Sequence, residues 1–426
     1  MITYFKYIIS GIFVVFISCE LSEKEIIEKN TFLIESIDPN EDDFRDLEFL
    51  KEILSDKKVL FLGESAHGDG STFQAKIRLI KFLHEDLNYK LIAFEGATIT
   101  DFYELNASKR KQCDLNKITR VFKTQLAPIW SATREFTPFY EYALENCNSL
   151  DFVGIDSNFG MTHSMSSALL KILEEDYNIR NNQEFEYEIF RSQFKELISK
   201  SYDLDLLSFD FDLFEQNLNL LKKIVNDNQN RESNKSEFII QELSNLSLNA
   251  NAIRKGLDRG NQMRDRQMAD NLIWVLNNRP INEKVIVWTA NFHSAKKLKE
   301  AIFNEQENFY EHYTTFAEFV SDAYGFDNVY SIATTSSTGK HNTFSKLDSI
   351  IAPEGSWEFQ FANNSKMDYG FINYSQINKT SIGDQEFESV ILGHVPHLGK
   401  WYKIFDGVLF IKKMKPSNFY YWENYE

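Results

Sequence analysis

The sequence has few cysteines and no excess of basic residues, and each shortage excludes a class of protein. Only three of the 426 residues are cysteine, Cys19, Cys113 and Cys147, which excludes a CxxC zinc site and a disulfide framework. We expect Cys113 and Cys147 to be free thiols that pack in the interior. Lysine and arginine number 46 against 63 acidic residues, a net charge of −17. Phosphate binding needs clustered Lys and Arg, so a nucleic acid is not an expected partner.

The glycine motifs that bind nucleotides are missing, and so is the Gly-x-Ser-x-Gly turn of serine esterases. Ser65 lies between Glu64 and His67 but lacks those flanking glycines. Direct attack by water therefore fits the sequence better than a covalent acyl-enzyme. Apolar material is abundant, with 43% hydrophobic and 15% aromatic residues, and this is enough for a sizeable globular core.

Long hydrophobic runs are scarce, and the one at the N-terminus indicates export. Lys6 precedes an apolar run over 7–18, about 12 residues against the roughly 20 that a membrane-spanning helix needs. Residues 1–18 are typical of a signal peptide, and Cys19 directly after them resembles the lipidated cysteine of a bacterial lipobox. We therefore expect a lipoprotein of the cell envelope, anchored to the membrane through Cys19, with a tether over 19–44. A plain signal peptide with an incidental cysteine, or a poorly cleaved anchor, is the alternative.

Four short apolar runs, each followed by a polar residue, predict an α/β fold with a mostly parallel central sheet flanked by helices. The runs cover 59–62, 91–94, 152–155 and 285–288. The polar residues that follow them are Glu64, Glu95, Asp156, and Asn291 with His293. In open α/β sheets, sites form beyond the carboxyl ends of the strands, so we expect these side chains in one pocket.

The sheet domain is expected in two parts, over 45–163 and 279–426. Between them, residues 164–278 are nearly free of Pro and Gly and alternate polar and apolar residues at helical spacing. This pattern predicts a helical insertion that could cap the site. Additional C-terminal strands are predicted at 329–333, 390–392 and 408–411.

One helix is expected over 71–87, with Phe73 and Ile80 on its buried face. Lys76 falls on the same face, where a cation is costly unless it meets a carboxylate or a cavity. Lys76 is therefore a candidate for the site. Arg78 falls on the opposite face, which we expect to be exposed to solvent.

The turn over 63–68, Gly-Glu-Ser-Ala-His-Gly, carries the strongest chemical signal. It follows a strand and places the carboxylate of Glu64 close to the imidazole of His67. An imidazole can take a proton from water, and a carboxylate fixes its tautomer and raises its basicity. Glu95 would add a second carboxylate, and His293 a further base or electrophile. These four side chains could instead bind a metal ion, or Glu64 and His67 could only stabilise the turn.

This turn and five later segments resemble the erythromycin esterase family. The similarity begins with Val-Leu-Phe-Leu-Gly-Glu-Ser-Ala-His-Gly at 59–68, Ala-Phe-Glu at 93–95 and Phe-Val-Gly-Ile-Asp at 152–156. It continues with Arg-Asp-Arg-Gln-Met-Ala-Asp-Asn at 264–271, Trp-Thr-Ala-Asn-Phe-His at 288–293 and Phe-Asp-Gly-Val-Leu-Phe-Ile at 405–411. In this order the segments cover most of the chain from residue 45 to residue 415.

The resemblance implies hydrolysis of a macrolide lactone by water, and with it antibiotic resistance. His67 would be the general base, Glu64 and Glu95 would orient the base and the water, and His293 would assist at the carbonyl or the leaving alkoxide. The expected substrate-binding residues are Lys76, Asn291 and Asp156. No cofactor is implied, and a divalent metal stays open.

Two positions depart from active members of the family. Lys76 stands where these usually carry Arg, and Ala290 stands where they carry the first His of a His-Asn-x-His pair. Lys keeps the charge but loses the bidentate geometry of a guanidinium. If the missing imidazole stabilised an oxyanion, its loss would cost on the order of 10²–10³ in rate. We therefore expect an exported Glu/His hydrolase of an ester or lactone; the alternative is a degenerate relative that binds a small ligand or a metal.

Overall fold

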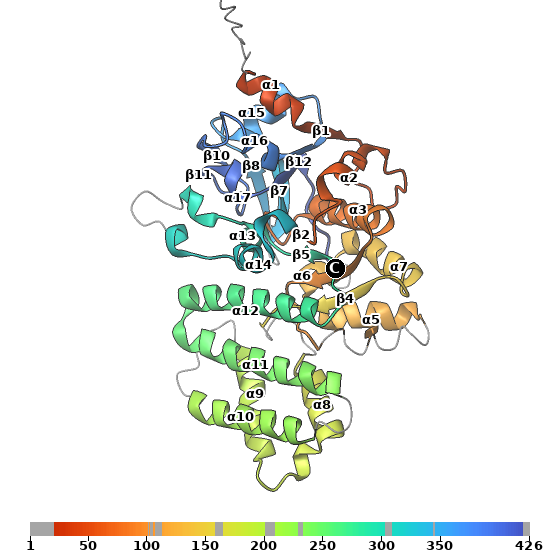
Figure 1. The fold of residues 1–426 in the computed structure, drawn as a ribbon, viewed down its shortest axis with the longest axis vertical. Coiled ribbons are helices and arrows are strands. Elements are labelled where there is room, and N and C mark those ends of the chain that lie inside the picture. Colours follow the sequence, from red (N-terminus) through yellow and green to blue (C-terminus); the bar gives the residue numbers. More distant parts are fainter. Residues whose placement is uncertain are drawn as a thin grey trace, which may run out of the picture.

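A mostly parallel sheet of nine strands forms the centre of the molecule, which confirms the predicted α/β fold (Figure 1). The computed structural model describes residues 21–420 apart from 101, 103–104, 107–112, 158–164, 201–208, 229–232, 303–308 and 344–345. Eight strands follow the order β1-β9-β12-β7-β2-β5-β3-β4, and β8 pairs with β7. Their bounds are β1 Thr31–Ile34, β2 Val59–Leu62, β3 Tyr89–Phe94, β4 Asp151–Gly154, β5 Lys284–Trp288, β7 Val329–Thr343, β8 Lys346–Ile351, β9 Tyr369–Ile372 and β12 Gly407–Met414.

The six strands from β12 to β4 are parallel, and their register brings the chain segments that follow them to one edge of the sheet. Leu62 at the end of β2 pairs with Trp288 at the end of β5, and Trp288 pairs with Phe94 at the end of β3. Phe94 in turn pairs with Gly154 at the end of β4. The loops that carry Glu64, Glu95, Asp156 and His293 therefore begin side by side.

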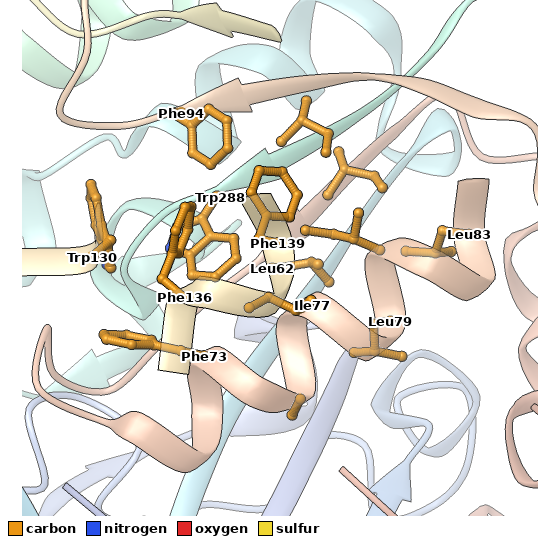
Figure 2. Packing of buried hydrophobic residues seen from close by; sticks show 14 of the residues in the cluster. Leu62, Phe73, Ile77, Leu79, Leu83, Phe94, Trp130, Phe136, Phe139 and Trp288 are labelled. Carbon is orange, nitrogen blue, oxygen red and sulfur yellow. The ribbon is translucent and has the colours of Figure 1, made fainter. Parts of the chain in front are cut away.

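Helices cover both faces of this sheet because alternate strand residues pack in opposite directions. On one face Leu62, Phe94 and Trp288 pack against α3 (Gly70–Leu87), α5 (Leu115–Gln125) and α7 (Thr137–Glu145). Figure 2 shows part of this cluster, with Phe73 and Ile77 of α3 beside the aromatic rings of Phe136 and Trp288. On the other face Phe61 and Val287 pack against α12 (Leu257–Asn277) and α14 (Phe316–Tyr324).

Between β4 and β5 the described residues form five α-helices, and Figure 1 shows them stacked below the sheet. They are α8 Met165–Tyr177, α9 Tyr187–Lys200, α10 Phe211–Asp227, α11 Ser233–Lys255 and α12. The first four share a hydrophobic core of their own, in which Phe190, Phe214 and Leu243 are fully buried. The last one, α12, instead packs its residues Met268 and Leu272 against the sheet. This helix therefore joins the inserted helices to the strands.

The remaining elements are short, and several of them lie around β9 and β12. A small sheet, β10-β11-β6, lies beside short helices that share a third core with β12. The bounds are α1 Glu23–Lys29, α2 Phe49–Leu54, α6 Pro128–Ser131, α13 Asn291–Ser294, β6 Ala301–Ile302, α15 Trp357–Asn364, α16 Tyr374–Ile377, β10 Phe387–Ser389, β11 His397–Gly399 and α17 Trp401–Ile404. Residues 1–18 and Cys19 lie outside the described residues, so the predicted signal peptide and lipidation site have no structural counterpart here. Among the described residues, no helix has the length and apolar character to span a membrane.

The expected exposure of Arg78 is wrong, because this side chain is only 2% exposed. Its two Nη atoms lie 2.7 and 3.0 Å from the carboxylate oxygens of Asp46, and they also donate to the carbonyls of Ser36 and Asp43. The helical pattern identified the face of α3 that packs on the sheet. It could not show that residues 36–46 fold back over the other face and supply a carboxylate.

The expectation that Cys113 and Cys147 are free thiols is also wrong, because they form a disulfide. Their Cα atoms lie 6.2 Å apart, a separation that a disulfide spans without moving the backbone. The bond ties the segment before α5 to the segment after α7. The low cysteine count excluded a framework of several bridges, but it did not exclude a single one.

The predicted strand over 390–392 is wrong as well. Backbone groups that would bond to a neighbouring strand are instead hydrogen-bonded to side chains. Glu358 accepts from the N–H of Val390, and Asn291 donates to the carbonyl of Ile391. The chain then turns through Gly393 and His394, both with positive φ. An apolar run can therefore be buried without pairing to a neighbouring strand.

Candidate active site

The four residues predicted to act together do lie at one edge of the sheet, in two linked groups. Glu64 follows β2, Glu95 follows β3 and His293 lies in α13 after β5. Glu64 and Glu95 are 0% and 1% exposed. The side chain of His67 is 37% exposed, and it therefore offers the group's most accessible titratable atoms to solvent.

Glu64 is the centre of the first group, and both of its oxygens are occupied. Oε1 lies 2.8 Å from His67 Nδ1 and 2.7 Å from the indole nitrogen of Trp130. Oε2 accepts a 2.7 Å bond from Nζ of Lys76, which also donates to the carbonyl of Thr289. Lys76 points inward as predicted and meets a carboxylate, the arrangement that makes a buried cation tolerable. Burial lowers the pKa of Lys76, and the charge of Glu64 opposes this effect.

The contact with Glu64 defines the state of the His67 ring. A carboxylate can only accept, so the proton on Nδ1 points to Glu64 and Nε2 keeps its lone pair when the ring is neutral. Burial lowers the pKa of His67, but the hydrogen bond and charge of Glu64 outweigh it and raise the pKa above 6.5. The charge of Glu95 also raises this pKa, whereas the charge of His293 lowers it.

Arg264 on α12 is the centre of the second group. Its Nη2 lies 2.9 Å from Glu95 Oε1 and 2.6 Å from Asp156 Oδ2, and its Nε donates to Asp156 Oδ1 at 2.9 Å. The second oxygen of Glu95 accepts from Thr289 Oγ1 at 2.6 Å and from the N–H of Ala290 at 3.0 Å. Burial raises the pKa of Glu95, but the charges of His293 and Arg264 outweigh it and hold the pKa far below 4.5.

His293 connects to the same group through both ring nitrogens. Nδ1 lies 2.5 Å from Oδ1 of Asp265, while Nε2 lies 3.2 Å from Arg264 Nη1 and 3.4 Å from Glu95 Oε1. Burial lowers the pKa of His293, but the charges of Asp265 and Glu95 outweigh it and raise the pKa above 6.5. The site thus has four buried carboxylates but only two basic side chains besides its histidines, Lys76 and Arg264, and this imbalance favours the charged form of a nearby histidine.

The three residues expected to bind substrate have their polar atoms engaged within the protein. Asn291 donates to the carbonyls of Thr334 and Ile391 and accepts from the N–H of Thr334. Asp156 holds Arg264, as described above, and also accepts from the N–H of Gly96. The side chain of Lys76 is 1% exposed, and its Nζ is paired with Glu64. Through these contacts Asn291, Asp156 and Lys76 hold the loops and charged groups around the site in place.

Three residues of the site were not predicted from the sequence. Arg264 and Asp265 begin a segment that resembles the family and lies in a long helix. This position was a signal from which their place in the site could have been predicted. Trp130 lies in α6, which contains no recognisable motif. Only the folded chain shows that its indole meets Glu64.

The carboxylates of the site are paired with cationic side chains and are not arranged as a set of ligands around a metal position. Among the described residues, no group of three or more His, Cys, Asp or Glu is placed to hold a metal ion. Lys76 and Arg264 occupy the oxygens that a divalent cation would need. A cavity of about 1070 Å³ lies elsewhere, between α1 and α15, and none of the site residues lines it.

Comparison with known proteins identifies the family. The erythromycin esterase family model matches residues 84–414. A protein of Bacillus subtilis named "Putative hydrolase YbfO" is 26% identical over 281 residues, which cover 61% of each chain. The chain thus matches about three fifths of that relative's length.

Two solved structures share the fold. A succinoglycan biosynthesis protein has a TM-score of 0.71 at 17% identity, with 93% of this chain and 98% of that chain covered. A mutant of the erythromycin esterase EreC in its open conformation has a TM-score of 0.66 at 14% identity, with 90% and 98% covered. Since the family match extends over most of the sequence, the chain belongs to the erythromycin esterase family.

Proposed function

We propose that this protein hydrolyses a carboxylic ester or lactone with a water molecule that His67 activates. The observation that carries the proposal is the pair formed by Glu64 and His67: the carboxylate is fully buried, whereas the imidazole is 37% exposed. A buried carboxylate orients the ring, and an accessible Nε2 can reach a water molecule. This is the arrangement that general-base hydrolysis needs.

In the proposed reaction the water oxygen attacks the carbonyl carbon while Nε2 of His67 takes a proton from the water. The carbonyl becomes a tetrahedral oxyanion, and then the bond to the alkoxide oxygen breaks. In this proposal His293, whose pKa is raised, gives the alkoxide a proton. The products are a carboxylic acid and an alcohol, joined in one molecule when the substrate is a lactone.

In this proposal Glu95 and Arg264 do not react but set the charge and position of the reacting side chains. Glu95 favours the charged form of His293, and Arg264 holds Glu95 and Asp156 in place. Because Ala290 has no imidazole, only His293 of the family's His-Asn-x-His pair is present to act on the oxyanion or the leaving group. The proposed reaction needs no cofactor, since base, acid and orienting groups are all side chains of this chain.

A macrolide lactone is one candidate substrate, suggested by the family's name and by that of EreC. The altered positions Ala290 and Lys76 make smaller esters and other lactones equal candidates. We further propose that the protein is an exported lipoprotein held at the cell envelope by Cys19. Mass spectrometry of the N-terminal peptide of the membrane fraction tests this: a lipid-modified peptide that begins at Cys19 supports it, and an unmodified one contradicts it.

The activity is tested with purified protein, a panel of macrolides and simple esters, and mass spectrometry of the products. The exposed His312 provides a matched control. We expect wild type and H312Q to add one water to a member of the panel, and H67Q to be slower by about 10²–10⁴-fold. Equal rates for H67Q and H312Q would contradict the assignment of His67.

The alternative is a relative that binds a small ligand without turnover, and Ala290 is the observation that favours it. A folded protein that retains a macrolide or ester in equilibrium dialysis but never hydrolyses it would support this alternative. Stoichiometric metal in the purified protein would favour a metal-binding version of it. Hydrolysis that persists after treatment with a chelator would exclude that version.

A further inference from the structure

Trp130 donates to the same oxygen of Glu64 that holds His67. Its indole nitrogen lies 2.7 Å from Glu64 Oε1, and His67 Nδ1 lies 2.8 Å from that atom. The rings of Trp130 and His67 meet edge to face at 89°, with centroids 5.4 Å apart. One carboxylate oxygen thus accepts from a neutral donor that cannot ionise and from an imidazole that can.

The position of Trp130 is strongly constrained. The side chain is 0% exposed and belongs to the aromatic cluster shown in Figure 2, where it lies at the side of the group that contains Phe136 and Trp288. The backbone of α6 is tied to the loop after Glu95, because the N–H of Ala127 donates to the carbonyl of Gly96. The indole N–H is therefore held in a fixed direction before any substrate binds.

We infer that Trp130 is a positioning residue for the base: its N–H fixes the rotamer of Glu64 and limits how strongly Glu64 holds the proton of His67. This inference rests on the proposed function, in which His67 must be neutral to accept a proton from water. Two donors share the charge on Oε1, so each receives less of it than it would alone.

Removing the indole N–H should strengthen the interaction of Glu64 Oε1 with His67. Lys76 still donates to the other oxygen of Glu64, while Oε1 then has His67 as its single donor. A buried acceptor that loses one partner interacts more strongly with the partner that remains. The pKa of His67 therefore rises, and less of the base is neutral at a given pH.

The test is the W130F variant, which keeps a buried aromatic ring and removes only the N–H group and part of the ring. Histidine NMR of the full chain, with the His67 signal assigned by its loss in H67Q, follows the ring through a pH titration. We expect the pKa of His67 to rise by about 0.5 to 1 in W130F, equivalent to roughly a three- to tenfold weaker acid. On a substrate, the acid limb of the pH profile of kcat/KM should move upward by the same amount.

Trp401 provides the matched control. It is also 0% exposed, and its indole donates at 2.9 Å to the carbonyl of Phe387, but it packs in a different core. W401F therefore loses the same kind of hydrogen bond away from Glu64, and the pKa of His67 should stay at its wild-type value. An unchanged pKa in W130F, or an equal change in both variants, overturns the inference.

A second measurement does not use W130F and remains informative if that variant fails to fold. In the unaltered protein the indole N–H resonance of Trp130 should titrate with the same midpoint as the His67 ring, because both groups share one oxygen. An indole resonance that does not move through that midpoint overturns the inference. Both titrations are independent of turnover: if they give the expected result and no ester is hydrolysed, the positioning role stands and the proposed function fails.

Discussion

Nζ of Lys76 lies 2.7 Å from Oε2 of Glu64, and the two side chains are 1% and 0% exposed. Glu64 of this buried ion pair also contacts Nδ1 of His67, so the turn that carries the base is fixed by a charge inside the core. A buried pair contributes little net stability compared with apolar residues, but removing one partner leaves an uncompensated charge. The identity of residue 76 therefore affects the turn even though its side chain does not reach solvent.

The K76M variant should lose about 3–5 kcal/mol of unfolding free energy, because the buried carboxylate of Glu64 loses its lysine partner. The double variant E64Q/K76M should recover part of this loss, since it removes both charges. K24M, which breaks an exposed pair with Glu28, should change stability by less than about 1 kcal/mol. Urea denaturation of the four proteins measures these differences, and a K76M protein as stable as K24M would contradict the prediction.

Gly68 closes the turn that carries His67, and it has no room for a side chain. An added Cβ would lie 1.6 Å from the carbonyl oxygen of Asn342 in β7, which is backbone and cannot rotate away. We expect G68A to destabilise the protein by about 1–3 kcal/mol or more and to displace His67. G355A is the control, because its Cβ would meet only the side chain of Glu388, at 3.6 Å. If thermal unfolding gave both variants the same Tm, the turn would not be as constrained as described.

Glu242 on α11 is fully buried beside Thr100 and Asn245, where α11 meets the loop that follows Glu95. Burial raises its pKa from 4.5 to about 7, against the opposing hydrogen bonds of these neighbours. Between these two pH values the unfolded chain has lost the proton that the folded chain still holds. Stability should therefore fall by about 3 kcal/mol as pH rises from 4.5 to 7, and then level off.

The E242Q variant tests this contribution, because glutamine is neutral at every pH. Its stability should exceed that of wild type at pH 8, and the difference should shrink toward pH 4.5. Denaturant titrations at several pH values measure this difference. A constant difference between the two proteins would show that Glu242 does not titrate in this range.

The disulfide between Cys113 and Cys147 closes a loop that contains α5, α6 and Trp130. The C113S/C147S double variant should be less stable by about 2–4 kcal/mol, because its unfolded chain has more freedom. A thiol reductant should lower the Tm of wild type toward that of the variant, and the Tm of the variant should not respond to it. If the reductant left wild type unchanged although free thiols appeared, the bond would not contribute to stability.

The parts of this structure that follow local patterns could be predicted from the sequence. The apolar run over 59–62 is β2, residue for residue, because a strand buried on both faces needs a continuous apolar run. The inward direction of Lys76 followed from helical spacing alone. The parallel strands then brought Glu64, Glu95 and His293 together, as expected for the loops at one edge of such a sheet.

The parts that depend on distant contacts could not be predicted. Arg78 is buried because Asp46 reaches it from another segment, and Trp130 meets Glu64 from 66 residues away. The side-chain amide of Asn291 donates to Thr334 and Ile391, which lie 43 and 100 residues further along the chain. Neither periodicity nor a motif around these residues indicates which side chain will be their partner.

The central claim is that neutral His67 is the base that activates water. The most direct test compares the acid-side midpoint of the pH profile of kcat/KM with the pKa of His67 from NMR titration, in one buffer. Since the pKa of His67 is raised, both values should coincide above 6.5, and activity should fall as pH drops through them. Activity that persists at pH values where His67 is fully protonated would contradict the claim.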